Sequence, residues 1–235
     1  MKSSRSTPLS NADRTKILAH SCRFLVLTGG PGAGKTAVME AVRQIFCEHV
    51  AILPESASIV YGGGFPRKNN SLGVRSVQKA IFHVQTELEN YVVEEAKAFV
   101  ALCDRGVVDG YAYWPKGDGE PDFFSSLGCT KEEAFARYHT VIHMRTPSAN
   151  RGYDLSNPVR IESPEQAAAL DAKIEAAWDG HPNRIIVDAT ERFTDKVEQV
   201  TKLILAAMPN CCPEMLNSHE IKQQKKISTN SNAIL

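Results

Sequence analysis

The sequence lacks a run of apolar residues long enough to cross a membrane, which takes roughly 18 residues. Residues 1–21 also lack the apolar stretch of a secretory signal. The six cysteines include no C-x-x-C pair, which indicates reduced thiols rather than a disulfide framework. We therefore expect a cytoplasmic protein with no membrane span.

The chain also lacks an excess of either charge and any internal repeat. Lys+Arg and Asp+Glu both number 27 among 235 residues, so the overall charge gives no reason to expect nucleic acid as a partner. A hydrophobic content of 43% is enough for a buried core. We expect one domain at 22–209 that binds small molecules, with a flexible N-terminus at 1–21 and a largely disordered tail at 210–235. The oligomeric state stays open.

Five short apolar segments recur along the chain. They lie at 24–28, 50–53, 99–103, 140–144 and 184–188. Helical spacing of apolar residues or a helix-capping pattern follows most of them. Short apolar strands that alternate with helices predict an α/β fold, in which a five-stranded parallel sheet carries helices on both faces.

The first segment passes directly into a glycine-rich loop with the pattern G-x-x-x-x-G-K-T. The loop consists of Gly29, Gly30, Pro31, Gly32, Ala33, Gly34, Lys35 and Thr36. Its glycines let several backbone N–H groups point at one anion, and the helix that follows adds its N-terminal dipole. Lys35 is expected to reach the β- and γ-phosphates and Thr36 to hold Mg²⁺. The loop predicts a nucleotide ligand, ATP or GTP.

Charged residues follow the next three strands, and ligands of an open parallel sheet bind at this edge. Glu55 follows the second strand, Asp104 and Arg105 end the third, and Arg145 follows the fourth. Asp104 fits a Walker B carboxylate that orders Mg²⁺, or it simply ends a strand. Glu55 is a catalytic carboxylate, a solvated residue of a turn or the first acidic residue of a helix.

The connection after the fourth strand carries Arg145, Arg151 and Arg160. Phosphoryl transfer needs cations near the transferred group, where charge spreads over its oxygens. The three arginines therefore predict a lid over the donor phosphates, or they are surface charges. Which of them contacts phosphate stays open.

From 23 to 207 the chain resembles the P-loop nucleoside and nucleotide kinase superfamily. It resembles more closely a small AAA-type NTPase family that includes a ribosylnicotinamide kinase domain and a GTP-binding trafficking protein. The resemblance rests on the glycine-rich loop, on 53–57, on 103–106 with Asp109, and on 184–190. It implies the three-layer P-loop NTPase fold. It also implies that Glu55 acts as the base on an acceptor hydroxyl and that Asp104 and Arg105 handle Mg²⁺ and phosphate.

Two functions follow from these residues. In the first, which we favour, the protein is a kinase that moves the γ-phosphoryl of ATP to a nucleoside-like or other small acceptor. In the second, it is a regulatory ATP- or GTP-binding module that controls a protein or membrane partner. The guanine motif N-K-x-D is absent, which counts against a Ras-like GTPase. Gln85 could contact an acceptor base or face water, and the aromatic residues of 109–128 line a ligand or seal the core.

Overall fold

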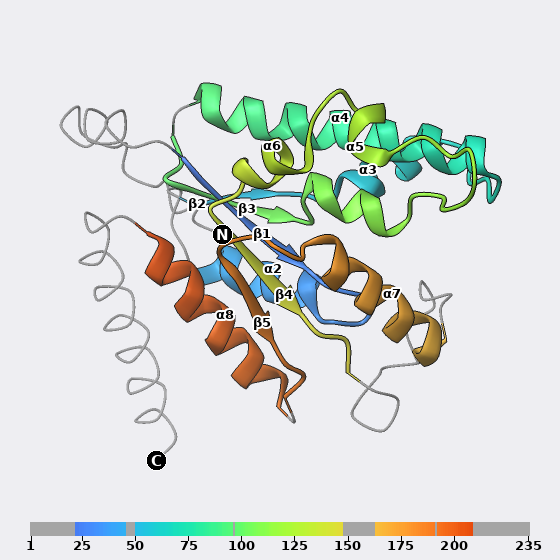
Figure 1. Cartoon of the computed structure of the whole chain (residues 1–235). Coiled ribbons are helices and arrows are strands. Elements are labelled where there is room, and N and C mark those ends of the chain that lie inside the picture. Colours follow the sequence, from blue (N-terminus) through green and yellow to red (C-terminus); the bar gives the residue numbers. More distant parts are fainter. Residues whose placement is uncertain (1–21, 46–49, 96, 148–162, 191, 209–235) are drawn as a thin grey trace, which may run out of the picture.

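The structure is a computed structural model that describes residues 22–45, 50–95, 97–147, 163–190 and 192–208 (Figure 1). Several predictions lie outside the described residues. They concern the N-terminus at 1–21, the whole tail at 210–235, and the arginines Arg151 and Arg160.

The centre of the molecule is a parallel five-stranded sheet. Its strands are β1 (Arg23–Thr28), β2 (Val50–Leu53), β3 (Val100–Asp104), β4 (Thr140–Met144) and β5 (Arg184–Val187). They lie in the order β2-β3-β1-β4-β5. All five predicted strands are confirmed, with bounds that differ by no more than one residue. The order places β1, which leads into the glycine-rich loop, between β3 and β4.

Helices cover both faces of the sheet. One face carries α2 (Lys35–Ile45) and α8 (Phe193–Ala207), which contact each other. The other carries α3 (Ser56–Gly62), α4 (Ser71–Glu95), α6 (Lys131–Ala136), α7 (Pro164–Ala177), the 3₁₀ helix η1 (Val107–Ala112) and the short α5 (Phe123–Ser126). Figure 1 shows α4 running along the top of the molecule and α8 on the opposite side. The predicted three-layer α/β fold is therefore confirmed.

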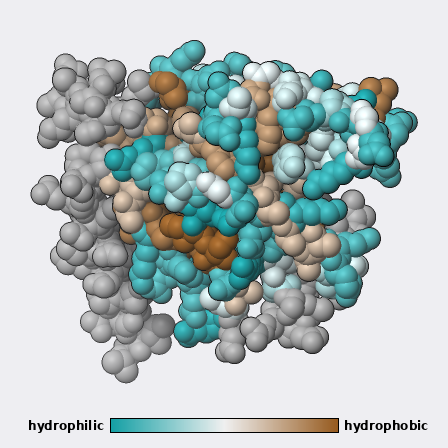
Figure 2. Space-filling view, in the orientation of Figure 1, coloured by the Kyte–Doolittle hydropathy of each residue, from teal (hydrophilic) through white to brown (hydrophobic). Residues whose placement is uncertain are grey.

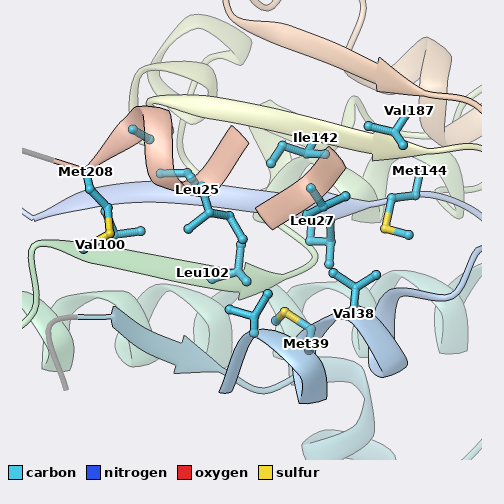
Figure 3. Close-up of a cluster of buried hydrophobic side chains, with 14 of the residues drawn as sticks. Leu25, Leu27, Val38, Met39, Val100, Leu102, Ile142, Met144, Val187 and Met208 are labelled. Atoms are coloured by element: carbon cyan, nitrogen blue, oxygen red, sulfur yellow. The ribbon is translucent and has the colours of Figure 1, made fainter. Parts of the chain in front are cut away.

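Side chains that alternate along β1 contribute to two hydrophobic cores, one on each face of the sheet. Leu25 and Leu27 belong to the cluster that includes α2 and α8, drawn in Figure 3, whereas Val26 belongs to the cluster that includes Trp178. Both faces of this strand are buried, as in other sheets covered on two sides. Full burial of a side chain such as Leu25 contributes about 1.5–3 kcal/mol to folding. The buried faces hold the ends of β1 and β3 in place, where the charged residues lie.

Two segments that the sequence suggests are irregular contain helix. The turn after β2 leads into α3, which Glu55 precedes as the N-cap residue. The segment 109–128 contains most of η1 and all of α5. Its aromatic residues divide between the two predicted roles: Trp114 is buried in the core, whereas Tyr113 lines a cavity.

The outer faces of the helices are mainly hydrophilic. Figure 2 shows teal residues over most of the visible face, with hydrophobic residues gathered near its middle. Among the described residues no helix combines the length and the hydropathy that a membrane span needs.

Candidate active site

The glycine-rich loop connects β1 to α2 with a backbone that only glycine adopts easily. Gly29, Gly32 and Gly34 have positive φ angles of 133°, 77° and 91°. A Cβ on Gly29 would lie 2.1 Å from the carbonyl oxygen of Met144, so any side chain there would displace the loop from β4. The first turn of α2 contains no acidic residue. Its N-terminal amides and dipole therefore remain available to an anion.

Lys35 lies inside this loop. Its side chain is buried, and Nζ donates to the carbonyl oxygens of Gly29 at 2.9 Å and Gly30 at 3.0 Å. Burial, with help from the nearby Arg105, lowers the pKa of Lys35 to about 7, although Asp104 acts in the opposite direction. A bound phosphate would supply the negative charge that favours the protonated amine.

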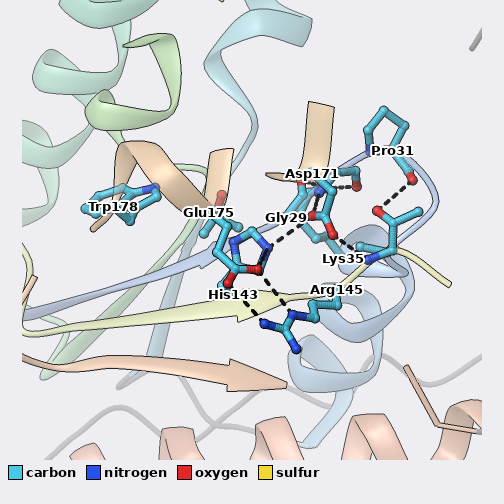
Figure 4. Close-up of polar contacts among 12 residues, drawn as sticks. Gly29, Pro31, Lys35, His143, Arg145, Asp171, Glu175 and Trp178 are labelled. Atoms are coloured by element: carbon cyan, nitrogen blue, oxygen red, sulfur yellow. Dashed lines mark hydrogen bonds and ion pairs between the residues drawn. The ribbon is translucent and has the colours of Figure 1, made fainter. Parts of the chain in front are cut away.

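Asp171 of α7 fixes the first half of the loop (Figure 4). Its Oδ1 accepts from the backbone N–H of Gly30 at 2.6 Å, and its Oδ2 accepts from that of Thr146 at 2.9 Å. The fully buried His143 places Nε2 3.1 Å from the same Oδ1. Burial alone would raise the pKa of Asp171, but His143 and the two N–H groups hold it below its usual value. The carboxylate therefore ties the loop to α7 and to the segment after β4.

Lys196 of α8 fixes the second half. Its Nζ donates to the carbonyl oxygen of Ala33 at 3.0 Å and to that of Arg145 at 2.9 Å. Burial lowers the pKa of Lys196 to about 8. The loop is thus held on two sides by charged side chains that bond its backbone.

Asp171 and Lys196 were not predicted as site residues, although the sequence carries a signal for each. Asp171 occupies the buried side of α7 between Ala167 and Ile174, and Lys196 precedes Val200 by one turn on the buried side of α8. A charged residue inside an apolar helical stripe is rare unless it has a partner. Such positions are therefore candidates for buried polar contacts.

Asp104 ends β3 opposite Leu27 of β1, next to the loop. Its Oδ1 is buried and has no hydrogen-bond partner within the described part of the chain. Burial raises the pKa of this carboxyl group, against the effect of Lys35. An open carboxylate oxygen beside a phosphate-binding loop fits a divalent cation, and Thr36 lies at the exposed start of α2.

Arg105 adopts a backbone conformation that is rare for its residue type. Its φ is 72°, and it is the only non-glycine residue with positive φ among those described. Its Nε donates to Glu55 Oε1 at 2.7 Å, and an Nη lies 3.3 Å from Asp109 Oδ1. Although burial opposes it, the surrounding acidic groups raise the pKa of Arg105, so the guanidinium stays charged. The strained turn places this cation between two carboxylates at the site.

Asp109 is the centre of the contacts behind Arg105. It accepts hydrogen bonds from the hydroxyl of Thr28, from the backbone N–H of Gly106 at 2.9 Å and from the indole N–H of Trp178 at 3.2 Å. Sequence reasoning named Asp109 only as part of the family resemblance. The structure makes it the anchor that connects β1, η1 and α7.

A cavity of about 450 Å³ opens beside the glycine-rich loop. Its wall includes Pro31 of the loop, Glu55, Arg105 and Asp109, and residues of α4 also line it. Burial raises the pKa of Glu55, but Arg105 and the hydroxyl of Ser58 outweigh that effect and hold the pKa below its ordinary value. Glu55 is therefore an ionised carboxylate at the edge of a hollow that adjoins the loop.

The structure brings four of the predicted catalytic residues to one edge of the sheet. Lys35 lies close enough to Glu55, Asp104 and Arg105 for their charges to shift its pKa. Arg145 follows β4 but directs its half-exposed guanidinium toward two carboxylates. It contacts Glu175 at 3.0 Å and Asp188 at 2.8 Å. Its role at the donor phosphates stays a prediction.

Residues 24–196 match the model of a family described as an AAA domain, so the chain belongs to that family. This range contains β2 to β5, all of β1 except Arg23, the glycine-rich loop and the walls of the cavity. It lies inside the predicted domain at 22–209. No curated protein matches the sequence.

Proposed function

Since the chain belongs to the AAA domain family, a P-loop NTPase-type family that binds nucleotide, we propose that it is a phosphotransferase. It moves the γ-phosphoryl of ATP, with GTP as an alternative donor, to a hydroxyl of a nucleoside-like or other small acceptor. The acceptor binds in the cavity beside the loop.

One observation carries this proposal: the cavity touches the phosphate-binding loop and presents Glu55 and Arg105. A kinase must hold its acceptor next to the γ-phosphate, with a carboxylate near the attacking hydroxyl and a cation near the transferred group. A protein that only senses nucleotide needs no such second cavity. Pro31, which lines the cavity, belongs to the loop itself.

Each residue of the site has a role in this reaction. The amides of the loop and Lys35 bind the β- and γ-phosphates. Thr36 and Asp104 would hold Mg²⁺, which neutralises phosphate charge when bound. Arg105 screens the transferred group, and its fixed position between Glu55 and Asp109 means that little reorganisation is needed during the reaction.

Glu55 accepts the proton of the acceptor hydroxyl. As the hydroxyl oxygen bonds the γ-phosphorus, the bond from that phosphorus to the β,γ-bridging oxygen breaks, and the nucleoside diphosphate leaves. Because phosphoryl transfer leaves the protein little covalent chemistry, the position of the carboxylate beside the hydroxyl matters as well as its basicity. Ser58 and Arg105 hold Glu55 in that position.

A second function is supported by the pairing of the same carboxylate. Glu55 Oε1 is bonded to Arg105 and Oε2 to Ser58 at 2.6 Å, so both oxygens have partners without an acceptor. Such a group suits a regulatory ATP- or GTP-binding module in which the ion pair reports the nucleotide state to a protein or membrane partner.

Glu55→Gln separates the two functions. A general-base role predicts that phosphoryl transfer to a nucleoside acceptor falls by about 10² or more, whereas ATP binding persists. Release of ADP is measured with a panel of nucleosides, and Glu87→Gln on α4 serves as the control with a distant exposed carboxylate. If no acceptor stimulates ADP release and the Glu55→Gln variant hydrolyses ATP like the wild type, the regulatory function replaces the kinase.

A further inference from the structure

Two buried glutamines of α4 face the cavity. Gln78 and Gln85 are seven residues apart on one side of the helix, and their side chains are 7% and 2% exposed. Gln85 Oε1 accepts from the hydroxyl of Ser56 at 2.6 Å, and Gln85 Nε2 donates to Glu89 Oε1 at 2.9 Å. The part of the cavity wall that α4 contributes is therefore polar at these two buried positions.

Glu89 determines which way the amide of Gln85 points. Its side chain is 1% exposed, and Arg137 donates to Glu89 Oε2 through two nitrogens, at 2.8 and 2.5 Å. The hydroxyl of Tyr138 donates to Glu89 Oε1 at 2.7 Å. Burial raises the pKa of Tyr138, so this hydroxyl keeps its proton. An ionised carboxylate only accepts hydrogen bonds, so the NH₂ of Gln85 must face Glu89 and its oxygen must face Ser56.

This arrangement leaves part of each amide free for a ligand. An amide has two N–H donors and two acceptor positions, and Ser56 and Glu89 use one of each on Gln85. Gln78 has no hydrogen-bond partner among the residues that the structure describes, although it is buried. Gln78 also lines the cavity, where a polar ligand could bond its amide.

The order of the free groups selects a type of ring. Ser56, which bonds the oxygen of Gln85, follows Glu55 directly in the chain. The oxygen of Gln85 therefore lies on the side where the acceptor hydroxyl binds in the proposed reaction. The nitrogen of Gln85 lies on the far side, toward Glu89. The complementary ring has an N–H donor nearer the sugar and a carbonyl acceptor farther from it. Uracil has this order at N3 and O4, and hypoxanthine has it at N1 and O6. Cytosine and adenine have the reverse order.

We propose that Glu89, held by Arg137 and Tyr138, is a positioning residue that determines acceptor specificity, because it fixes the amide of Gln85 for rings with an adjacent N–H and carbonyl. The proposal rests on the proposed function for the place of the acceptor in the cavity. Its substrate class is a nucleoside with a lactam edge.

Binding of uridine and cytidine to the full chain, measured by calorimetry, tests the proposal without any phosphoryl transfer. The wild type is expected to bind uridine about tenfold or more tightly than cytidine, the usual discrimination of a two-point amide contact. Glu89→Gln places an amide that donates as well as accepts next to Gln85, so the preference should fall to about threefold or less. Glu87→Gln, an exposed carboxylate of the same helix, should keep the full preference.

A second variant, Gln85→Met, removes the amide and should also abolish the preference, so the test does not depend on the folding of Glu89→Gln alone. Equal binding of the two nucleosides by the wild type, binding of neither, or a preference for cytidine would overturn the proposal. A preference that survives Glu89→Gln in a folded variant would overturn it too. Selective binding of uridine without phosphoryl transfer would refute the kinase and leave this proposal standing. Phosphoryl transfer to another acceptor, with no preference for uridine over cytidine, would support the kinase and overturn this proposal.

Discussion

The proposed site has a donor half, the glycine-rich loop, and an acceptor half, Glu55, Arg105 and the cavity beside them, and the two are held by different kinds of contact. On the donor half, Asp171 and Lys196 bond backbone groups of the glycine-rich loop. On the acceptor half, side chains bond side chains, as in the contact of Arg105 with Glu55. Backbone groups are the same for every residue type, whereas side-chain pairs depend on both partners. The donor half is therefore defined by the shape of the chain, and the acceptor half by the identity of its residues.

The difference has a consequence for specificity. A change of the donor half should weaken the reaction with every acceptor, because all acceptors share the phosphate donor. A change of the acceptor half should depend on the acceptor offered. The experiments below use this distinction, from the largest expected effect to the smallest.

Lys35→Ala should have the largest effect. It removes the cation expected at the β- and γ-phosphates, so turnover should fall by about 10² to 10³, the scale for loss of one charge-stabilising group. The increase in melting temperature caused by Mg-ATP should disappear. An unchanged increase would show that Lys35 does not contact the nucleotide.

Asp171→Ala tests the contacts that hold the loop. It leaves the buried N–H of Gly30 without its acceptor and also frees that of Thr146, at a cost of about 1–3 kcal/mol for each group that remains unsatisfied. The free energy of unfolding and the affinity for ATP should both fall. The fall in ATP affinity should be the same whichever acceptor is present. Asp179→Ala is the control, since this carboxylate forms an exposed ion pair worth about 0–1 kcal/mol. A loss of ATP affinity seen with one acceptor only would contradict the distinction between the donor half and the acceptor half.

The titration of Lys35 should make nucleotide binding depend on pH, with a smaller effect than the two substitutions above. The pKa of Lys35 is about 7 in the folded protein, below its value of 10.5 in an unfolded chain. The unfolded chain therefore binds more protons between these values, and Lys35 makes stability without nucleotide rise with pH across that window. Phosphate favours the protonated amine, so ATP affinity should instead fall as the pH rises through 7.

Lys35→Met provides the check on that dependence. Calorimetry at several pH values should find that this variant has lost the change of ATP affinity that begins near pH 7 in the wild type. A variant with the same pH dependence as the wild type would assign the effect to another group. The ionisation of ATP itself, which is common to both proteins, cancels in the comparison.

The sequence predicted the donor half better than the acceptor half, for a physical reason. The glycine-rich loop is contiguous, and its residue types follow from the geometry of phosphate binding. The groups that hold it come from far along the chain: Gly30 and Asp171 are 141 residues apart. Sequence patterns place residues on strands and helices but do not give the pairing of distant side chains.

The acceptor half shows the same limit. Glu55, Asp104 and Arg105 were predicted because each lies at the carboxyl end of a strand of a parallel sheet. Helix α3 was expected only as one alternative for Glu55, and it places Ser56 next to Gln85. The role of Glu89 depends on Arg137 and on Tyr138, 49 residues away, so no local pattern indicates it.

The hydrogen bond between Trp178 and Asp109 gives the protein an internal optical probe. The indole is fully buried, and its N–H donates to the carboxylate that also contacts Arg105. A ligand that moves the guanidinium changes the electric field at the indole, and with it the emission. Because the chain has only two tryptophans, replacing Trp114 with phenylalanine would leave a single fluorophore in contact with the active site. Occupancy of the cavity could then be followed in real time without any label.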